Sequence, residues 1–259
     1  MFRNFDFGSN WAEFSKRHVD SQRLEMACES LRKLLEEEKL EGKSFLDVGC
    51  GSGLFSIAAH RLGATKVVGI DVNPRCIEIA RANRDLLAPS APIEFHVASA
   101  LDVEQLEGFG TFDRVYAWGS LHHTGSMWNA VHNVLGCVAP GGTLVLAIYN
   151  KHSTSPAWRS IKWFYNQVPQ LVQRFMIFSF AGVIYSAKFL VTRTNPLKKE
   201  RGMDFWFDVI DWVGGYPYEY ETPEKIKRTM CKQGFDLKLY TPARVPTGCN
   251  EFVFRRIAT

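Results

Sequence analysis

The chain has 259 residues, of which 46% are hydrophobic and 22% charged, the composition of an ordinary globular protein without the charge or repeat bias of disorder. Its 31 basic and 27 acidic residues give a formal net charge of +4, which argues against a nucleic-acid-binding protein, because such proteins normally carry a concentrated basic stripe. This length can bury a full core, and we expect residues 1–259 to form one domain.

The first 42 residues are expected to be a helical segment and not a signal peptide. Asp6 and Glu13 interrupt any apolar stretch before it reaches useful length, and apolar residues at helical spacing predict a helix from Ser21 to Leu40. The six cysteines are scattered, with no Cys-x-x-Cys pair and no metal-ligand spacing, so we predict reduced thiols and no metal site. A cytoplasmic protein fits these features.

Residues 43–150 alternate short β-rich runs with helical runs. The expected strands are Ser44–Val48, Lys66–Asp71, Ile93–Ala98, Arg114–Trp118 and Thr143–Tyr149, and the expected helices are Leu54–Leu62, Pro74–Leu87 and Trp128–Val138. This alternation predicts right-handed βαβ units and a mostly parallel, doubly wound sheet.

A glycine-rich segment follows the first expected strand and leads directly into a helix. It reads Asp-Val-Gly-Cys-Gly-Ser-Gly from Asp47 to Gly53, with glycines at 49, 51 and 53. This is the architecture of a nucleotide site at the carboxyl edge of a parallel sheet. A dinucleotide fingerprint would need Gly-x-Gly-x-x-Gly, but position 54 is Leu, so the spacing argues against NAD.

Polar and small residues also follow the next three strands. Asp71 ends the second strand, where a carboxylate can accept hydrogen bonds from ribose hydroxyls. Ala98–Asp102 follows the third strand, and Trp118–His123 ends the fourth and continues beyond it. Pro140-Gly141-Gly142 forms the break before the fifth strand.

Residues 151–221 interrupt the alternation and are expected to form an insertion, after which residues 222–259 complete the sheet. The insertion contains the apolar run Leu171–Val191, whose uncharged core, Phe175–Ala187, is shorter than the roughly 20 residues of a spanning helix. We expect a helix packed on the domain, with a helix lying on a membrane surface as the alternative. The final segment predicts a helix (Pro223–Gln233) and an antiparallel hairpin of two strands (Phe235–Tyr240, Asn250–Arg255).

These motifs together resemble, in register from about Lys43 to Asn150, the class I S-adenosylmethionine-dependent methyltransferases. The resemblance implies a Rossmann-like sheet of seven strands and S-adenosylmethionine as the cofactor. Later runs, such as Gly214-Gly215-Tyr216-Pro217 and Gly248–Phe252, are similar to a bacterial branch with small-molecule acceptors, often found with glycan or secondary-metabolite genes.

The resemblance also implies roles for individual residues. Asp47 with Gly49, Gly51 and Gly53 would bind the methionine portion of the cofactor, Asp71 the ribose, and Ser99, Ala100 and Leu101 the adenine. The family more often has Asp at the position of Ser99. Trp118 is placed either to line the cofactor pocket or to fill the core.

His122 and His123 are the candidate catalytic residues, since a histidine near the methyl donor can remove a proton from the acceptor. Adjacent side chains point in different directions, so at most one of them is expected to act as a base, and a structural hydrogen bond is the alternative. Tyr149, Asn150, Tyr216, Tyr218 and Glu219 are further candidates for substrate contacts, with packing as the alternative.

The sequence therefore predicts methyl transfer to a hydroxyl, or less favourably an amine, of a small or lipid- or glycan-linked acceptor. Eight aromatic residues of the insertion predict an apolar lid over this acceptor, with attachment of the insertion to the domain as their alternative role; they are Trp158, Trp163, Phe164, Tyr165, Phe205, Trp206, Phe207 and Trp212. The alternative functions are a tRNA or other nucleic-acid methyltransferase, suggested by the cluster Arg193, Lys198, Lys199, Arg201 and by Arg255 and Arg256, and a non-catalytic cofactor-binding protein.

Overall fold

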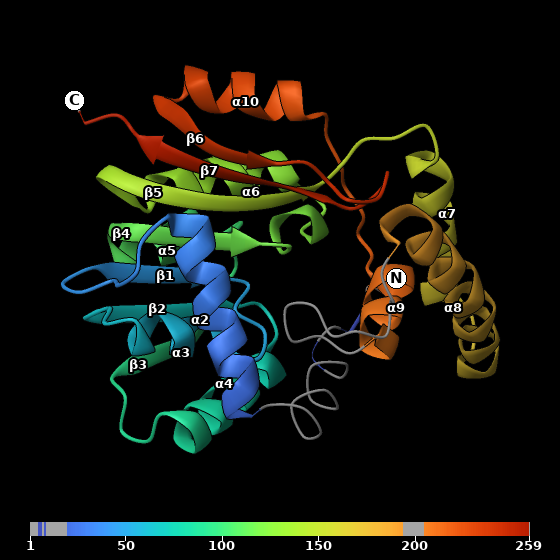
Figure 1. The fold of residues 1–259 in the computed structure, drawn as a ribbon, viewed down its shortest axis with the longest axis horizontal. Helices are drawn as coiled ribbons and strands as arrows, with labels where there is room; N and C mark the ends of the chain where they lie inside the picture. The colour runs from blue at the N-terminus through green and yellow to red at the C-terminus, as the bar shows by residue number, and fades with distance from the viewer. Residues whose placement is uncertain (1–4, 7, 9–19, 194–204, 259) are drawn as a thin grey trace.

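A computed structural model of the chain describes residues 5–6, 8, 20–193 and 205–258, and within them the strands form one seven-stranded sheet (Figure 1). The strand order is β3-β2-β1-β4-β5-β7-β6. The strands are β1 (Ser44–Val48), β2 (Lys66–Asp71), β3 (Ile93–Val97), β4 (Phe112–Trp118), β5 (Val138–Tyr149), β6 (Phe235–Thr241) and β7 (Cys249–Arg256). Strands β1 to β5 are parallel, and β7 is antiparallel to both β5 and β6, which confirms the predicted fold class.

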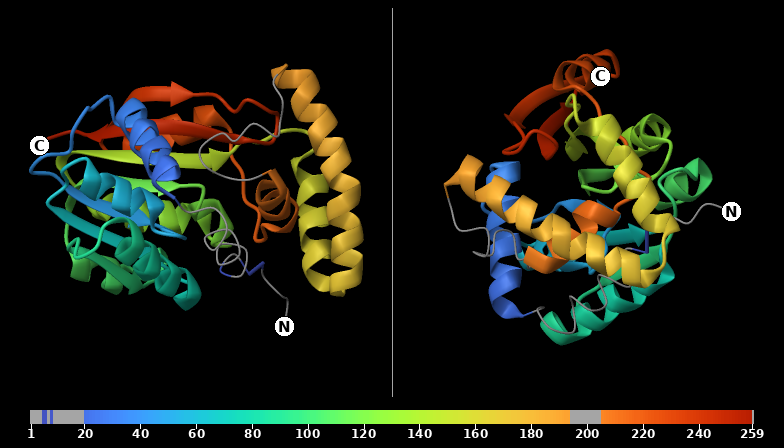
Figure 2. Two further views of the ribbon diagram at one scale, coloured as in Figure 1. Left: turned by 60° about the horizontal axis from the view of Figure 1, so that its bottom comes forward. Right: turned by 90° about the vertical axis from the view of Figure 1, so that its right-hand side faces the viewer.

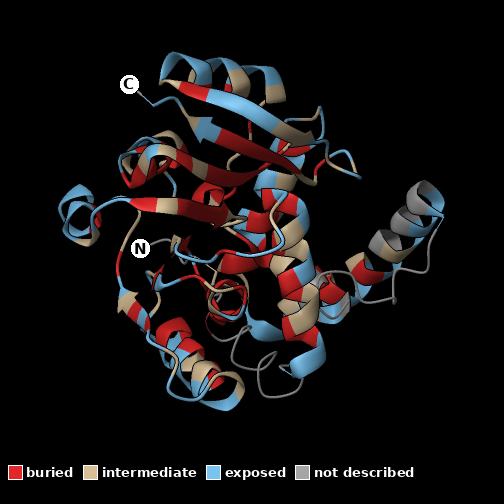
Figure 3. Ribbon diagram, turned by 60° about the vertical axis from the view of Figure 1, so that its left-hand side comes forward, coloured by how far each residue is buried: buried red, intermediate tan, exposed pale blue. Residues whose placement is uncertain are grey.

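Helices cover both faces of the sheet because successive strand residues point to opposite sides. Phe45 joins an apolar cluster with α2 (Ser21–Leu35), α3 (Leu54–Arg61) and α4 (Pro74–Leu87). Its neighbour Leu46 joins a second cluster with α5 (Val103–Phe109), α6 (Met127–Gly136) and α10 (Pro223–Lys232) on the other side. Figure 3 shows that the buried residues concentrate along the strands between these two layers.

Most boundaries of the predicted helices and strands lie within two residues of the prediction, but two differ by five residues and one helix was not predicted. The N-terminal helix ends at Leu35 instead of Leu40, because Glu36 takes a left-handed conformation. Helix α5 was not predicted, and it begins after Asp102, whose carboxylate accepts a hydrogen bond from the Gln105 N–H at 3.1 Å. Strand β5 begins at Val138, which pairs with Phe112 before the register shift, so the Pro-Gly-Gly turn lies inside the strand.

The insertion forms α7 (Ser155–Gln167), α8 (Gln170–Thr192) and α9 (Phe205–Gly214). Figures 1 and 2 place these helices at the end of the molecule toward which the parallel strands point. They have an apolar cluster of their own, formed by Tyr165, Ile177, Ala181, Val209 and Val213. Among the described residues, no helix combines the length and the apolar character that a membrane crossing requires.

Candidate functional site

The glycine-rich segment forms a tight turn at the carboxyl end of β1. Gly49, Gly51 and Gly53 have φ angles of +75°, +52° and +74°, in the left-handed region that favours glycine. The Gly49 and Cys50 N–H groups donate to the Ile70 carbonyl at 2.8 and 2.9 Å, which ties the turn to the end of β2. A Cβ atom on Gly49 would lie 2.3 Å from the Ser120 Cβ, so the turn also packs closely against the segment that follows β4.

Asp71 is held over this turn by two backbone hydrogen bonds. Its Oδ2 accepts from the Gly51 N–H at 3.0 Å, and its Oδ1 accepts from the Asn73 N–H at 2.8 Å. Burial raises the pKa of the Asp71 carboxyl, and these two bonds oppose that effect. Each carboxylate oxygen keeps a second lone pair, so the position suits the predicted contact with two ribose hydroxyls.

Asp47 is a second buried carboxylate beside the same turn. The Ser56 hydroxyl donates to its Oδ2 at 2.7 Å. Burial, with a smaller contribution from the nearby Asp71 charge, raises the pKa of Asp47 to about 7. No lysine or arginine of the described residues forms an ion pair with Asp47 or Asp71. Two carboxylates around one loop fit a positively charged ligand, and S-adenosylmethionine carries both an ammonium and a sulfonium.

The segment predicted to contact adenine combines hydrogen-bonded backbone groups with exposed apolar side chains. Ser99 Oγ accepts from the Leu101 N–H at 3.1 Å, and the Ala100 carbonyl accepts from Asn133 Nδ2 at 3.1 Å. Leu101 is 41% exposed and Val72, just after β2, is 70% exposed. Such side chains can pack against a flat aromatic base. Trp118, at the end of β4, is half-buried and packs against the apolar cluster on the α2 side of the sheet.

The two candidate catalytic histidines lie in a short 3-10 turn, Leu121–His123, beyond β4. His122 is buried under Tyr149, with ring centroids 4.0 Å apart, and burial lowers the pKa of its imidazole well below the usual range. His123 is half-buried, and its Nδ1 lies 2.6 Å from the Pro217 carbonyl oxygen. Because a carbonyl can only accept, Nδ1 carries the proton and Nε2 keeps a lone pair. Burial lowers the pKa of His123 to about 3, so its ring is neutral at neutral pH.

Lys162 on α7 was missed by the sequence analysis and lies next to these histidines. Its side chain is fully buried, and its Nζ donates to the Trp212 carbonyl on α9. The Nζ also lies 4.8, 5.3 and 5.6 Å from the ring centroids of Tyr218, Trp212 and Tyr149. Burial lowers its pKa to about 7, although the charge of Asp211 acts in the opposite direction. The available signal was a lysine within an aromatic helix that contains no acidic residue.

Several other candidate contact residues have structural partners. The Glu219 carboxylate accepts from the Met127 N–H at 3.0 and 3.1 Å at the start of α6. Asn150 Nδ2 donates to the Pro246 carbonyl at 2.8 Å. Tyr218 is buried against Tyr149, whereas Tyr216 is half-buried and its carbonyl accepts from the Phe5 N–H. These contacts join the insertion and the N-terminal segment to the carboxyl edge of the sheet.

The aromatic residues of the insertion divide into two groups. Trp158 packs against Trp212 with ring centroids 4.0 Å apart, and Tyr165 is buried, so these rings hold the helices together. The exposed group comprises Trp163, Phe164 and Trp206, which are 40%, 49% and 44% exposed. The side chains of Phe205 and Phe207 lie outside the described part of the structure.

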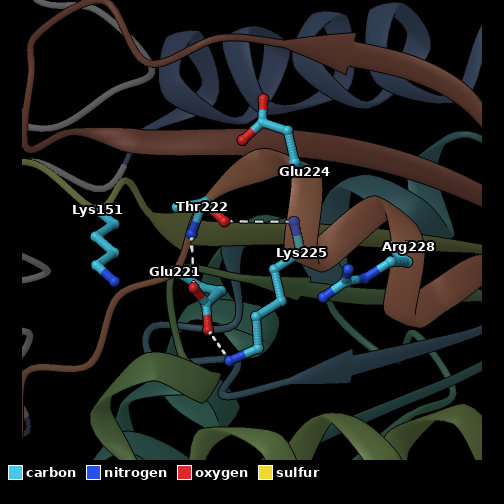
Figure 4. A pocket seen from close by; sticks show the side chains of 6 residues that line it. All are labelled: Lys151, Glu221, Thr222, Glu224, Lys225 and Arg228. Atoms are coloured by element: carbon cyan, nitrogen blue, oxygen red, sulfur yellow. Dashed lines mark hydrogen bonds and ion pairs between the residues drawn. The ribbon is translucent and has the colours of Figure 1, made fainter.

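The structure describes only part of the basic cluster that suggested a nucleic-acid acceptor. Arg256 donates to the Val138 carbonyl, while Arg255 is exposed on β7, and residues 198–201 lie outside the described ranges. A pocket of about 350 Å³ lies beside the end of β5 and is lined by both basic and acidic side chains (Figure 4). Its residues are Lys151, Glu221, Thr222, Glu224, Lys225 and Arg228. Lys225 pairs with Glu221 at 2.6 Å, and none of the predicted cofactor residues lines this pocket.

Comparisons with known proteins agree with this geometry. A family model described as a methyltransferase domain matches residues 19–237. A ubiquinone biosynthesis O-methyltransferase of Xanthomonas campestris is 37% identical over 112 residues, which are 43% of this chain and 45% of that protein, so the chain matches less than half the length of this curated relative. Two solved structures share the fold.

The magnesium protoporphyrin IX methyltransferase of Synechocystis, solved with S-adenosylhomocysteine, matches with a TM-score of 0.58 at 14% sequence identity. The match covers 96% of this chain and 93% of the Synechocystis chain. An S-adenosylmethionine-dependent methyltransferase of Mesorhizobium loti matches with a TM-score of 0.54 at 17% sequence identity, over 88% of this chain and 96% of the Mesorhizobium chain. The matched range includes the glycine turn, Asp47 and Asp71, whose charge and geometry fit the same cofactor. The chain therefore belongs to the methyltransferase-domain family and has the fold of the solved S-adenosylmethionine-dependent methyltransferases.

Proposed function

We propose that this protein is an enzyme that uses S-adenosylmethionine to methylate a hydroxyl oxygen of a small, or lipid- or glycan-linked, acceptor in the cytoplasm. The observation that carries this proposal is the group of His122, His123, Tyr149 and Lys162, whose side chains lie close together beyond the ends of β4 and β5. Ser120 packs against the glycine turn at Gly49, and the turn that contains the two histidines begins at the next residue. The group therefore lies near the predicted cofactor site. The free thiols of all six cysteines are in keeping with a reducing compartment.

S-adenosylmethionine supplies a methyl group that is already strongly electrophilic. The protein must therefore align the acceptor, exclude water and manage one proton. His123 is the better placed of the two predicted bases, because it is half-buried and its Pro217 hydrogen bond leaves Nε2 as an acceptor. We assign His123 the task of accepting the hydrogen bond of the acceptor hydroxyl. As the methyl group passes from the sulfonium to the oxygen, the hydroxyl proton passes to Nε2, and with a pKa of about 3 the imidazolium gives that proton up to water.

An oxygen acceptor is favoured over an amine by the charge of Lys162. A buried ammonium near the acceptor stabilises a developing oxyanion, whereas it repels a protonated amine. With a pKa of about 7, which the charge of Asp211 keeps from falling further, Lys162 carries its ammonium in part of the molecules at neutral pH. The partial similarity to a ubiquinone biosynthesis O-methyltransferase points to the same atom type.

The insertion, residues 151–221, is proposed to act as the lid of this site. Its first residue, Lys151, donates to the Glu221 carbonyl, and the Glu221 N–H donates to the Tyr149 carbonyl, so both ends of the insertion are fixed at the end of β5. Lys162 then reaches back from α7 toward Tyr149. Covering this edge suits an acceptor site, because ligands of open α/β folds bind at the carboxyl ends of the strands.

The test uses S-adenosylmethionine labelled with carbon-13 in its methyl group. The purified protein is incubated with metabolite and lipid extracts, and the labelled product is isolated and its methyl resonance is assigned by NMR to an O-methyl or an N-methyl group. An Asp71→Ala variant, which loses the carboxylate that holds the Gly51 N–H, controls for label incorporated by other enzymes. An N-methyl product would contradict the proposed acceptor atom while leaving the family assignment intact.

A further inference from the structure

Helix α8 is apolar on the side that faces away from the protein. Five large apolar side chains on this side are exposed, with exposed fractions between 46% and 79%; they are Leu171, Phe175, Phe178, Phe189 and Leu190, and we call them the α8 outer face. The opposite side of the same helix, at Ile177 and Ala181, is buried in the cluster shared with α7 and α9. An ordinary surface helix carries polar residues on its outer side, so α8 departs from that pattern.

Three of these side chains form a strip in the first half of the helix. Leu171, Phe175 and Phe178 follow one another at helical spacings of four and three, and therefore lie on one side of the helix. The Phe178 ring lies 5.7 Å from the ring of Trp206, which is itself 44% exposed, so the strip extends onto α9. Figure 2 shows in its right-hand view that α8 crosses the end of the molecule in front of α9.

The charge of this segment is entirely positive. Residues 151–193 contain six of the 31 basic residues of the chain and none of its 27 acidic ones, so the rest of the chain carries a slight negative charge. Arg174 and Arg193 are exposed on or beside the apolar strip, and Arg159 is exposed on α7. Although α9 carries Asp208 and Asp211, α8 itself has exposed aromatic and aliphatic side chains, flanking arginines and no acidic residue, the features of a helix that lies in the plane of an anionic bilayer.

We propose that the α8 outer face docks the enzyme on the surface of a membrane that contains anionic lipids. The helix lies in the interface and does not cross it, in agreement with the absence of a spanning helix in the described part of the chain. A second copy of the chain fits this face less well, because a two-fold interface would set the same arginines against each other. The docking does not depend on the proposed acceptor.

Vesicle flotation tests this proposal with the full-length protein. The probes are vesicles of phosphatidylcholine alone and of phosphatidylcholine mixed with phosphatidylglycerol. The main variant is Phe175→Ser with Phe178→Ser, and the matched control is Leu86→Ser on α4, which removes an apolar side chain that is 68% exposed on another part of the surface. Binding of S-adenosylhomocysteine by calorimetry shows that each variant is folded.

The wild type and Leu86→Ser should float with anionic vesicles, and less with phosphatidylcholine alone or at high salt. The double variant should bind anionic vesicles on the order of tenfold or more weakly, because it lacks the two exposed phenyl rings that would enter the bilayer on docking. Changing Arg174 and Arg193 to Gln should reduce the preference for anionic lipid. Absence of vesicle binding by the wild type, or equal binding by the double variant, would overturn the proposal. Light scattering that shows a dimer dissociated by the double variant, without vesicle binding, would assign the face to self-association instead.

Discussion

The buried lysine of the insertion gives the sharpest test of the site described above. Replacing Lys162 by Met keeps a side chain of similar length but removes the ammonium and its hydrogen bond to the Trp212 carbonyl. The folded protein holds the pKa of Lys162 at about 7, against 10.5 for the free side chain. Between these pH values the unfolded chain binds a proton that the folded chain does not bind, so the stability of the wild type rises with pH through this window.

The size of the effect follows from the two pKa values. Below pH 7 the charged form costs the folded state on the order of 5 kcal/mol, and this cost falls by about 2 kcal/mol between pH 7 and pH 9. Met has no such cost, although loss of the Trp212 bond and of the contacts with the Tyr218 and Tyr149 rings offsets part of the gain. We therefore expect Lys162→Met to be at least as stable as the wild type at pH 7 and to lose methyl transfer.

Denaturant unfolding at several values between pH 6 and pH 9.5 measures this dependence. The quantity of interest is the difference in unfolding free energy between wild type and variant, in which the titration of the buried cysteines cancels. Lys227→Met serves as the control, because Lys227 also lies over an aromatic ring, that of Tyr240, but at the protein surface. If the unfolding free energies of the wild type and Lys162→Met changed with pH in parallel over this range, burial would not lower the pKa of Lys162 in the folded protein.

Four further outcomes are expected. Asp71→Ala should weaken S-adenosylhomocysteine binding by about 1.5–3 kcal/mol in calorimetry, because a charged acceptor of two ribose hydrogen bonds is lost; Asp85→Ala, on the exposed side of α4, should bind normally, and equal affinity in both would place the ribose elsewhere. With the pKa of Asp47 at about 7, cofactor affinity should rise roughly tenfold from pH 6 to pH 8 as the carboxylate ionises and meets the cofactor ammonium, and Asp47→Asn should abolish this rise; a persistent pH dependence would point to another group. His123→Gln should lower turnover by about 10²-fold or more with unchanged cofactor affinity, and near-normal turnover would leave the imidazole a structural role. Replacing residues 151–221 by a short linker should preserve cofactor binding and abolish methyl transfer, provided that the core gives a cooperative unfolding transition; full activity of that core would refute the lid.

Much of the predicted cofactor-binding core, residues 43–150, could be predicted from the sequence because its sequence patterns are local. The glycine spacing from Asp47 to Gly53 reflects three left-handed φ angles, which few other residues adopt. The bounds of β1 and β2 were predicted correctly, since short β-rich runs between turn residues are characteristic of buried parallel strands. Asp71 could be placed from its distance along the chain to the turn, and its bond to the Gly51 N–H agrees with that placement.

The proposed acceptor site could not be predicted in the same way, because it is formed by contacts between distant parts of the chain. No local pattern shows that Lys162 meets Tyr149 and Tyr218, or that His123 bonds to Pro217, because each contact joins segments that are brought together only when the insertion packs on the sheet edge. The same holds for the α8 outer face. Helical periodicity in the sequence shows which residues share a side of a helix, but packing alone decides which side is covered, and α7 and α9 cover Ile177 and leave Phe175 exposed.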